Sequence, residues 1–210
     1  MPILVRFRML FHLKYGKIKG TNYFGDDMSI DDYRPTYMVE AVYDLRANDL
    51  LRQGITAVLV DLDNTLIAWN NPDGTPEVRA WLDEMTMADI SVVVVSNNNH
   101  SRVERAVSRF GVDFISRAMK PFAYGIDKAI DRYGFDREEV IMVGDQLMTD
   151  IRASHRAGIK SVLVKPLVQS DAWNTKINRW RERRVLAKLE KKYGKLSYQK
   201  GCLLYTSDAA

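Results

Sequence analysis

From residue 57 onward, short apolar runs alternate with longer segments in which apolar residues recur every three or four positions. The apolar runs, rich in Val and Ile as strands buried on both faces are, predict strands at 57–62, 90–95, 113–116, 140–143 and 161–164. The amphipathic segments predict helices at 76–88, 102–110, 122–133 and 147–157. This alternation predicts a three-layer α/β/α fold with a central parallel sheet.

The first of these strands ends in the acidic motif DLDNTL, in which Asp61 and Asp63 flank Leu62, and Thr65 follows. Reactive groups of open α/β sheets gather beyond the carboxyl ends of the strands. Two carboxylates this close repel each other unless a cation lies between them. A hard divalent ion, most simply Mg²⁺, relieves the repulsion and attracts phosphate. The motif alone also fits sugar-nucleotide enzymes and acidic loops.

Two further polar motifs follow the second and third strands. Ser96 begins a run with the asparagines 97–99, whose hydroxyl and backbone N–H groups are suited to phosphate oxygens, although the run alone predicts only a turn. Lys120 places a single ammonium near the same edge of the sheet. A lone lysine is usually solvated, so its meaning depends on the other motifs.

The fourth strand is followed by GDQLMTD, which supplies Asp145 and Asp150 at the start of a helix. Gly144 allows a tight turn and a close approach of the backbone. We expect Asp145 to complete the metal site.

The order DxDxT, Ser, Lys and GDxxxxD, with each member after a strand, closely resembles the haloacid dehalogenase superfamily and its Rossmann-like fold. The resemblance implies a magnesium-dependent phosphatase that forms an aspartyl-phosphate, with Asp61 as nucleophile and Asp63 as general acid and base. A carboxyl group at position 63, where the ion-pumping branch has Thr, favours phosphatase or mutase chemistry. The implied supporting residues are Thr65, Ser96, Asn97 and Lys120 for phosphate, Asp61, Asp63 and Asp145 for the metal, and Asp150 as an auxiliary carboxylate.

The intervals between the motifs have no room for a large cap domain. About thirty residues separate Thr65 from Ser96, and one loop, one helix and one strand use them. The loop 69–76, with Trp69, is the remaining lid candidate. We therefore expect an open site, which suits phosphate on a large carrier, or closure by another subunit, better than a small free metabolite. The oligomeric state stays open.

At finer grain, DLDNTLIAWNNPDGTP, SNNN, MKP and GDQLMTDI resemble the YqeG-type phosphatases, which are related to mitochondrial phosphatidylglycerophosphate phosphatases. The resemblance covers about residues 28–200 and includes RPTYMVEAVYDL and DAWNTKINRWRERRVLAKL. It implies phosphatidylglycerophosphate or a similar lipid-presented phosphate as substrate. Soluble sugar, nucleotide or protein phosphates are the alternative, and a second alternative is an RNA- or ribosome-associated module that uses the basic tail.

Charge is distributed unevenly along the chain. Of 31 Lys and Arg and 27 Asp and Glu, residues 1–19 and 176–200 together hold 15 bases and two acids, which leaves 16 bases and 25 acids elsewhere. An acidic centre disfavours a generic nucleic-acid-binding domain. In the tail, apolar residues from Ile177 to Tyr193 approximate one face of a basic helix. This helix either contacts anionic membrane or docks on the domain.

These observations predict a basic N-terminal extension at 1–27, a phosphatase domain at 28–170 and a basic amphipathic helix at 171–200. The extension reads either as upstream sequence or as an interfacial anchor. Residues 202–210, CLLYTSDAA, resemble a translated sequencing adapter, so we expect them not to be native. The sole cysteine, Cys202, allows no disulfide, and no apolar run approaches the ~20 residues of a membrane span. We expect a cytoplasmic location, with peripheral contact at the inner face of the membrane as an option.

Overall fold

The structure is a computed structural model that describes residues 29–199 apart from 69–70, 72 and 169–172, and that describes residues 173–179 by their backbone alone. The predictions on residues 1–27, on Trp69 and on the adapter-like tail therefore lie outside the described residues. The predictions on Ile177 and on the other side chains in the first turns of the C-terminal helix also lie outside the described residues.

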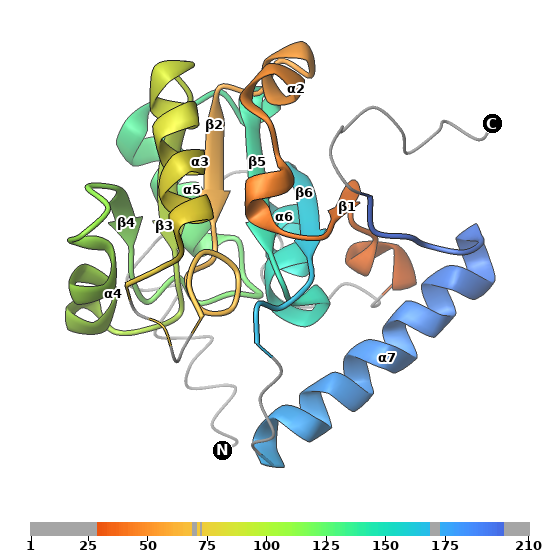
Figure 1. Ribbon diagram of the computed structural model, residues 1–210. Coiled ribbons are helices and arrows are strands. Elements are labelled where there is room, and N and C mark those ends of the chain that lie inside the picture. Colours follow the sequence, from red (N-terminus) through yellow and green to blue (C-terminus); the bar gives the residue numbers. More distant parts are fainter. Residues whose placement is uncertain (1–28, 69–70, 72, 169–172, 200–210) are drawn as a thin grey trace, which may run out of the picture.

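Six parallel strands form one sheet in the order β1-β6-β5-β2-β3-β4 (Figure 1). The strands are β1 (Tyr37–Val39), β2 (Ala57–Val60), β3 (Ser91–Val95), β4 (Asp113–Ile115), β5 (Val140–Gly144) and β6 (Lys160–Val164). The predicted central parallel sheet is confirmed, and no large cap domain interrupts the described part of the chain. β1 was not predicted, and it extends the sheet beside β6.

Helices cover both faces of this sheet, because successive residues of a strand point to opposite sides. Val58 and Val60 face the core shared with α2 (Ala47–Arg52), α3 (Pro76–Met87) and α4 (His100–Val107). Ala57 and Leu59 face the core shared with α5 (Tyr124–Tyr133) and α6 (Arg152–Ala157). The three-layer prediction is thereby confirmed, and its four helices are present with shifted ends.

Two helical predictions differ from the structure in detail. The predicted helix 147–157 begins as a π-helix, η4 (Leu147–Ile151), before α6 continues it. The C-terminal helix α7 (Trp173–Tyr193) ends seven residues before position 200. Gly194 follows it, and its φ of 85° is one that glycine adopts without strain. Gln199 then pairs with β1, donating its N–H to the Met38 carbonyl at 2.9 Å.

The apolar face of α7 packs against the domain. Val185 and Leu186 pack onto a small core formed by Met38, Leu147, Ile151 and Leu163. At its end, Lys192 and Tyr193 both donate hydrogen bonds to Asp31 of the 3₁₀-helix η1 (Ile30–Tyr33). Docking on the domain, one of the two expectations for this helix, is therefore observed. In the described part of the chain no helix is both long and apolar enough to cross a membrane.

Candidate active site

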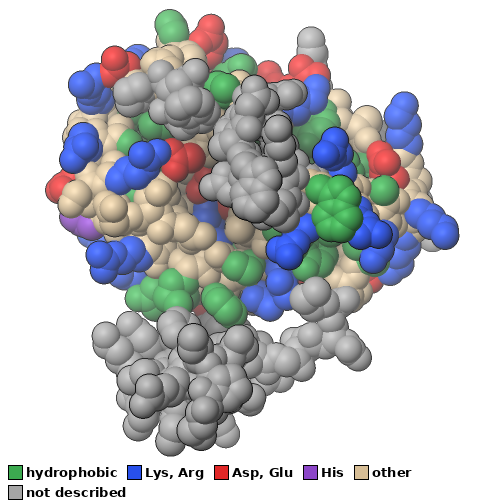
Figure 2. Space-filling model, turned by 90° about the horizontal axis from the view of Figure 1, so that it is seen from below, with side chains coloured by type: hydrophobic (Ala, Val, Ile, Leu, Met, Phe, Trp, Pro, Cys, Tyr) green, Lys and Arg blue, Asp and Glu red, His purple; other side chains and the backbone are tan. Residues whose placement is uncertain are grey.

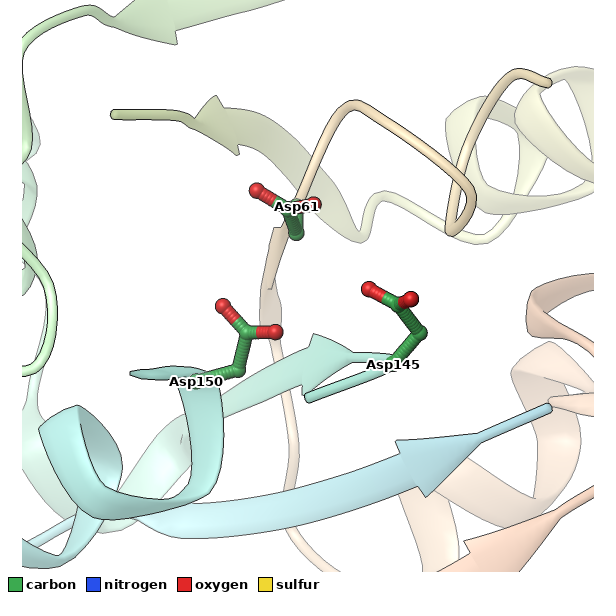
Figure 3. A group of neighbouring side chains, drawn as sticks. All are labelled: Asp61, Asp145 and Asp150. Atoms are coloured by element: carbon green, nitrogen blue, oxygen red, sulfur yellow. The ribbon is translucent and has the colours of Figure 1, made fainter. Parts of the chain in front are cut away.

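Three carboxylates meet where β2 and β5 end (Figure 3). Asp61 directly follows β2, and its N–H donates to the Val143 carbonyl at 2.9 Å, so the sheet ladder fixes its backbone. Asp145 follows β5, and Asp150 projects from η4. One oxygen from each of these three side chains lies within 4.8 Å of the others. The sheet thus brings together acids that are up to 89 positions apart in the sequence.

Lys120 lies between two of these acids and is almost completely buried. Its Nζ is 2.6 Å from an Asp61 oxygen and 2.7 Å from an Asp150 oxygen. Asn97 fixes the Lys120 backbone, because its amide donates to the Lys120 carbonyl at 2.9 Å and accepts from the Lys120 N–H at 2.8 Å. The amide of Asn97, predicted to bind phosphate, is thus engaged in holding Lys120.

The site has more negative than positive charge. Burial raises the pKa of Asp61 to about 6, an effect that the Asp150 charge increases and that Lys120 partly offsets. Burial, together with Asp150 and Asp61, raises the pKa of Asp145 well above its usual range. For Lys120, the attraction of Asp150 and Asp61 outweighs burial, so its pKa is raised. One ammonium therefore does not neutralise three carboxylates, and the oxygen-only donor set fits a hard divalent cation.

Asp63 is not one of the three clustered acids, and its carboxylate has other partners. Its two oxygens accept from the Asn98 amide at 2.5 Å and from the Arg102 guanidinium at 2.8 Å. The same Asn98 amide donates to the Ser96 hydroxyl oxygen at 3.1 Å, which links Ser96 to Asp63. The cluster of carboxylates that the structure brings together thus consists of Asp61, Asp145 and Asp150. Asp63 as a metal ligand stays a prediction.

The remaining predicted residues support this arrangement. The Thr65 hydroxyl donates to Asp145 at 3.3 Å, and the Gln146 N–H donates to Asp150 at 3.1 Å. A Cβ on Gly144 would collide with the Asp150 carboxylate, so the predicted close approach at this glycine is observed. Each predicted site residue therefore lies at or beside one edge of the sheet.

Binding of a divalent cation is expected to stabilise the protein, and more so at pH 7.5 than at pH 5. The pKa of Asp61 lies above its unfolded value of 3.8, so ionisation destabilises the metal-free fold as the pH rises from about 4 to about 6. A cation binds the ionised form, whereas below pH 6 it must first displace a proton. Thermal unfolding with and without 5 mM MgCl₂ at both pH values measures the difference. An equal Mg²⁺ effect at both pH values would contradict it.

Buried acids and a lysine beyond the carboxyl ends of a parallel sheet lie where open α/β folds bind their ligands. Residues 12–158 match the model of the haloacid dehalogenase-like hydrolases. The chain belongs to this family, and it is a phosphatase of the family.

Among curated proteins, the chain is 34% identical over 160 residues to "Probable phosphatase YqeG" of Bacillus subtilis (strain 168), covering 76% of this chain and 93% of that protein. It is 29% identical over 143 residues to "Phosphatidylglycerophosphate phosphatase 1, chloroplastic/mitochondrial" of Arabidopsis thaliana, covering 62% of this chain and 41% of that protein. Among solved structures, an uncharacterised protein from Listeria monocytogenes serotype 4b aligns with a TM-score of 0.46 at 19% identity, over 56% of this chain and 84% of that one. The family assignment rests on the family model and on the first relative.

Proposed function

We propose that the protein is a magnesium-dependent phosphomonoesterase in which Asp61 attacks phosphorus and carries the phosphoryl group as an aspartyl-phosphate. The observation that carries the proposal is the pairing of buried Asp61 with Lys120 beside Asp145 and Asp150. Bound Mg²⁺, held by Asp61 and Asp145, would offset the carboxylate charge and that of the transferring phosphoryl group. Lys120 supplies a second, fixed positive charge for the phosphoryl oxygens.

Asp63 is the residue proposed to move protons. In the first half-reaction it gives a proton to the departing alkoxide, and in the second it takes one from the water that hydrolyses the aspartyl-phosphate. Its hydrogen bonds with Asn98 and Arg102 hold the carboxylate beside the site. Ser96, which accepts a hydrogen bond from Asn98, and Thr65 are the proposed hydroxyl contacts for phosphate.

Phosphate on a lipid headgroup is the proposed substrate, with phosphatidylglycerophosphate as the leading example. The printed name of the Arabidopsis relative supports this substrate, and so does the absence of a large cap over the described domain. The exposed side of α7 adds a basic surface, since Arg181, Arg183 and Arg184 are exposed and the Arg184 guanidinium lies 4.4 Å from the centre of the half-exposed Trp180 ring. Each base near an anionic membrane contributes about 1 kcal/mol to binding.

The proposed membrane contact is electrostatic and does not require insertion of the apolar face of α7, because Val185 and Leu186 already pack on the domain. Glu182 on the same helix is close enough to raise the pKa of Asp145. The core on which α7 packs includes Leu147 and Ile151 of η4, the element that carries Asp150, so the helix runs beside the carboxylates. Figure 2 shows Lys and Arg side chains on both sides of the face at the carboxyl ends of the strands.

Turnover of phosphatidylglycerophosphate in anionic vesicles is expected to exceed turnover of soluble phosphomonoesters, because α7 would concentrate the enzyme at the headgroups. Phosphate release is measured with Mg²⁺ for the lipid in vesicles and for glycerol 3-phosphate, a sugar phosphate and a nucleotide. Arg181→Gln with Arg184→Gln should lower the vesicle rate about tenfold. Lys128→Gln with Arg132→Gln on α5 is the charge-matched control.

Equal rates with lipid and soluble substrates, unaffected by vesicles or by the α7 substitutions, would favour a phosphatase of soluble phosphates. If Asp61→Asn left the cellular phenotype intact while loss of residues 176–200 abolished it, an RNA- or ribosome-associated role of the tail would be favoured instead.

A further inference from the structure

Four arginines lie side by side on the flank of the site that Asp63 occupies. Arg102 and Arg105 belong to α4, Arg109 follows it, and Arg117 comes from the loop after β4. Spacings of three and four residues place the first three on one side of the helical turn. Arg102 and Arg105 line two hollows, one shared with Arg117 and the other with Asp63 and Arg109. The arginine row (102, 105, 109 and 117) is therefore continuous with the site.

Only part of this positive charge is matched. Arg102 pairs with Asp63, and Arg109 pairs with Asp73. Within the part of the chain that the structure describes, the guanidinium groups of Arg105 and Arg117 have no carboxylate partner, and the acid nearest in sequence to Arg105, Glu104, lies 3.8 Å from His100. Two exposed guanidinium groups thus remain available to an anion: Arg105 lines both hollows, one of them with Asp63, and Arg117 lines the other.

The shape of the second hollow agrees with this charge pattern. Its lining is apolar at Leu62, Ile67, Ala68 and Ala106 and polar at Asp63 and at the arginines 102, 105 and 109. A volume of about 290 Å³ is enough for a short carbon linker with one anionic group, and too small for acyl chains. Because Asp63 lies in the wall, a leaving group that takes its proton from Asp63 would continue into this hollow.

We propose that the arginine row binds a second anionic group of the substrate, held by the leaving group a few bonds away from the phosphate that is removed. The inference deepens the proposed function and rests on it. It assigns the substrate class as a phosphomonoester with an additional phosphodiester or phosphate. Guanidinium groups suit both, because they donate paired N–H groups to the oxygens. The phosphodiester of a lipid headgroup and the second phosphate of a soluble bisphosphate share this chemistry.

The test compares substrates with and without the second anion. For wild type and for Arg105→Gln with Arg117→Gln, kcat/KM is measured with Mg²⁺ on glycerol 3-phosphate, glycerol 1,3-bisphosphate and a short-chain phosphatidylglycerophosphate. The ratio of either two-anion substrate to glycerol 3-phosphate is expected to fall about tenfold or more, mainly through KM. Lys128→Gln with Arg132→Gln removes equal charge from α5 and should leave the ratio unchanged. A fall for the lipid identifies the headgroup as a source, and a fall confined to the bisphosphate identifies a soluble compound.

A binding measurement separates this inference from the proposed reaction. Glycerol 1,3-bisphosphate and glycerol 3-phosphate are titrated into Asp61→Asn with Mg²⁺, with and without the two arginine substitutions. If the bisphosphate binds more tightly than glycerol 3-phosphate, and the two arginine substitutions remove this preference, the subsite is supported even if no phosphomonoester is turned over. Equal affinities, or a kcat/KM ratio that survives the substitutions, would overturn the subsite and leave the phosphatase proposal intact.

Discussion

Asp61→Asn is expected to abolish phosphomonoester turnover, with a loss of about 10⁴-fold or more. Removal of a nucleophile from other enzymes that form covalent intermediates has effects of this size. An amide has the shape of the carboxylate, but it lacks the charge needed to attack phosphorus, and its neutral oxygen is a weaker ligand for a cation. Phosphate release from the preferred substrate in the panel, with Mg²⁺ in excess, measures the loss.

The folded state of Asp61→Asn should survive. Asp61 is one of three crowded acids and burial raises its pKa to about 6, so replacing it removes repulsion, while Lys120 keeps its contact with Asp150. An unfolding temperature without metal that is equal to or above that of wild type is the control. An Asn variant that folded normally and kept a tenth of the wild-type turnover would exclude Asp61 as the nucleophile.

Lys120→Met should damage both stability and activity. Met has a similar volume but leaves Asp61 and Asp150 buried without their cation, and loss of one partner of a buried ion pair costs about 3–5 kcal/mol. Without metal, the loss should deepen as the pH rises from about 4 past 6, because Asp61 must then ionise without the ammonium. Urea unfolding at several pH values measures the loss of stability. Turnover should fall about 100-fold or more.

The response to Mg²⁺ separates the effect of Lys120→Met on stability from its effect on turnover. A cation at the carboxylates restores part of the lost stability, whereas it cannot replace an ammonium aimed at phosphoryl oxygens. We therefore expect Mg²⁺ to raise the unfolding temperature of the variant more than that of wild type while turnover stays low. A variant as stable as wild type at pH 7.5 without metal would show that the ion pairs contribute little.

The sheet and the meeting of Asp61 with Asp145 could be predicted because both depend on local patterns. Strands covered on both faces appear as continuous apolar runs, and parallel strands bring their carboxyl ends to one edge. Asp61 and Asp145 follow two such runs, so their meeting needed only the strand order β5-β2. The burial of Lys120 between two acids could not be predicted in this way, because it depends on a loop that no periodicity describes.

Other features depend on contacts that the sequence pattern does not encode. Asn98 and Arg102 were not identified as partners of Asp63, because the direction in which their side chains point depends on where α4 begins. Asn99 caps that helix by accepting from the Arg102 N–H at 2.9 Å, and the helix starts two residues earlier than its apolar pattern indicates. Asn99 is a good capping residue, so its position was the available signal. β1 has only three residues, too few for a recognisable alternation.

The pairing of β1 with β6 also sets an order of events during synthesis. Thr36, just before β1, exchanges hydrogen bonds with Ser161, at a separation of 125 residues. At about 5–20 residues per second, a ribosome needs roughly 6–25 s to make the intervening chain. β1 must wait that long for its neighbour, while β2 and β3 are complete much earlier. The edge on which α7 later docks is thus among the last parts of the nascent protein to close.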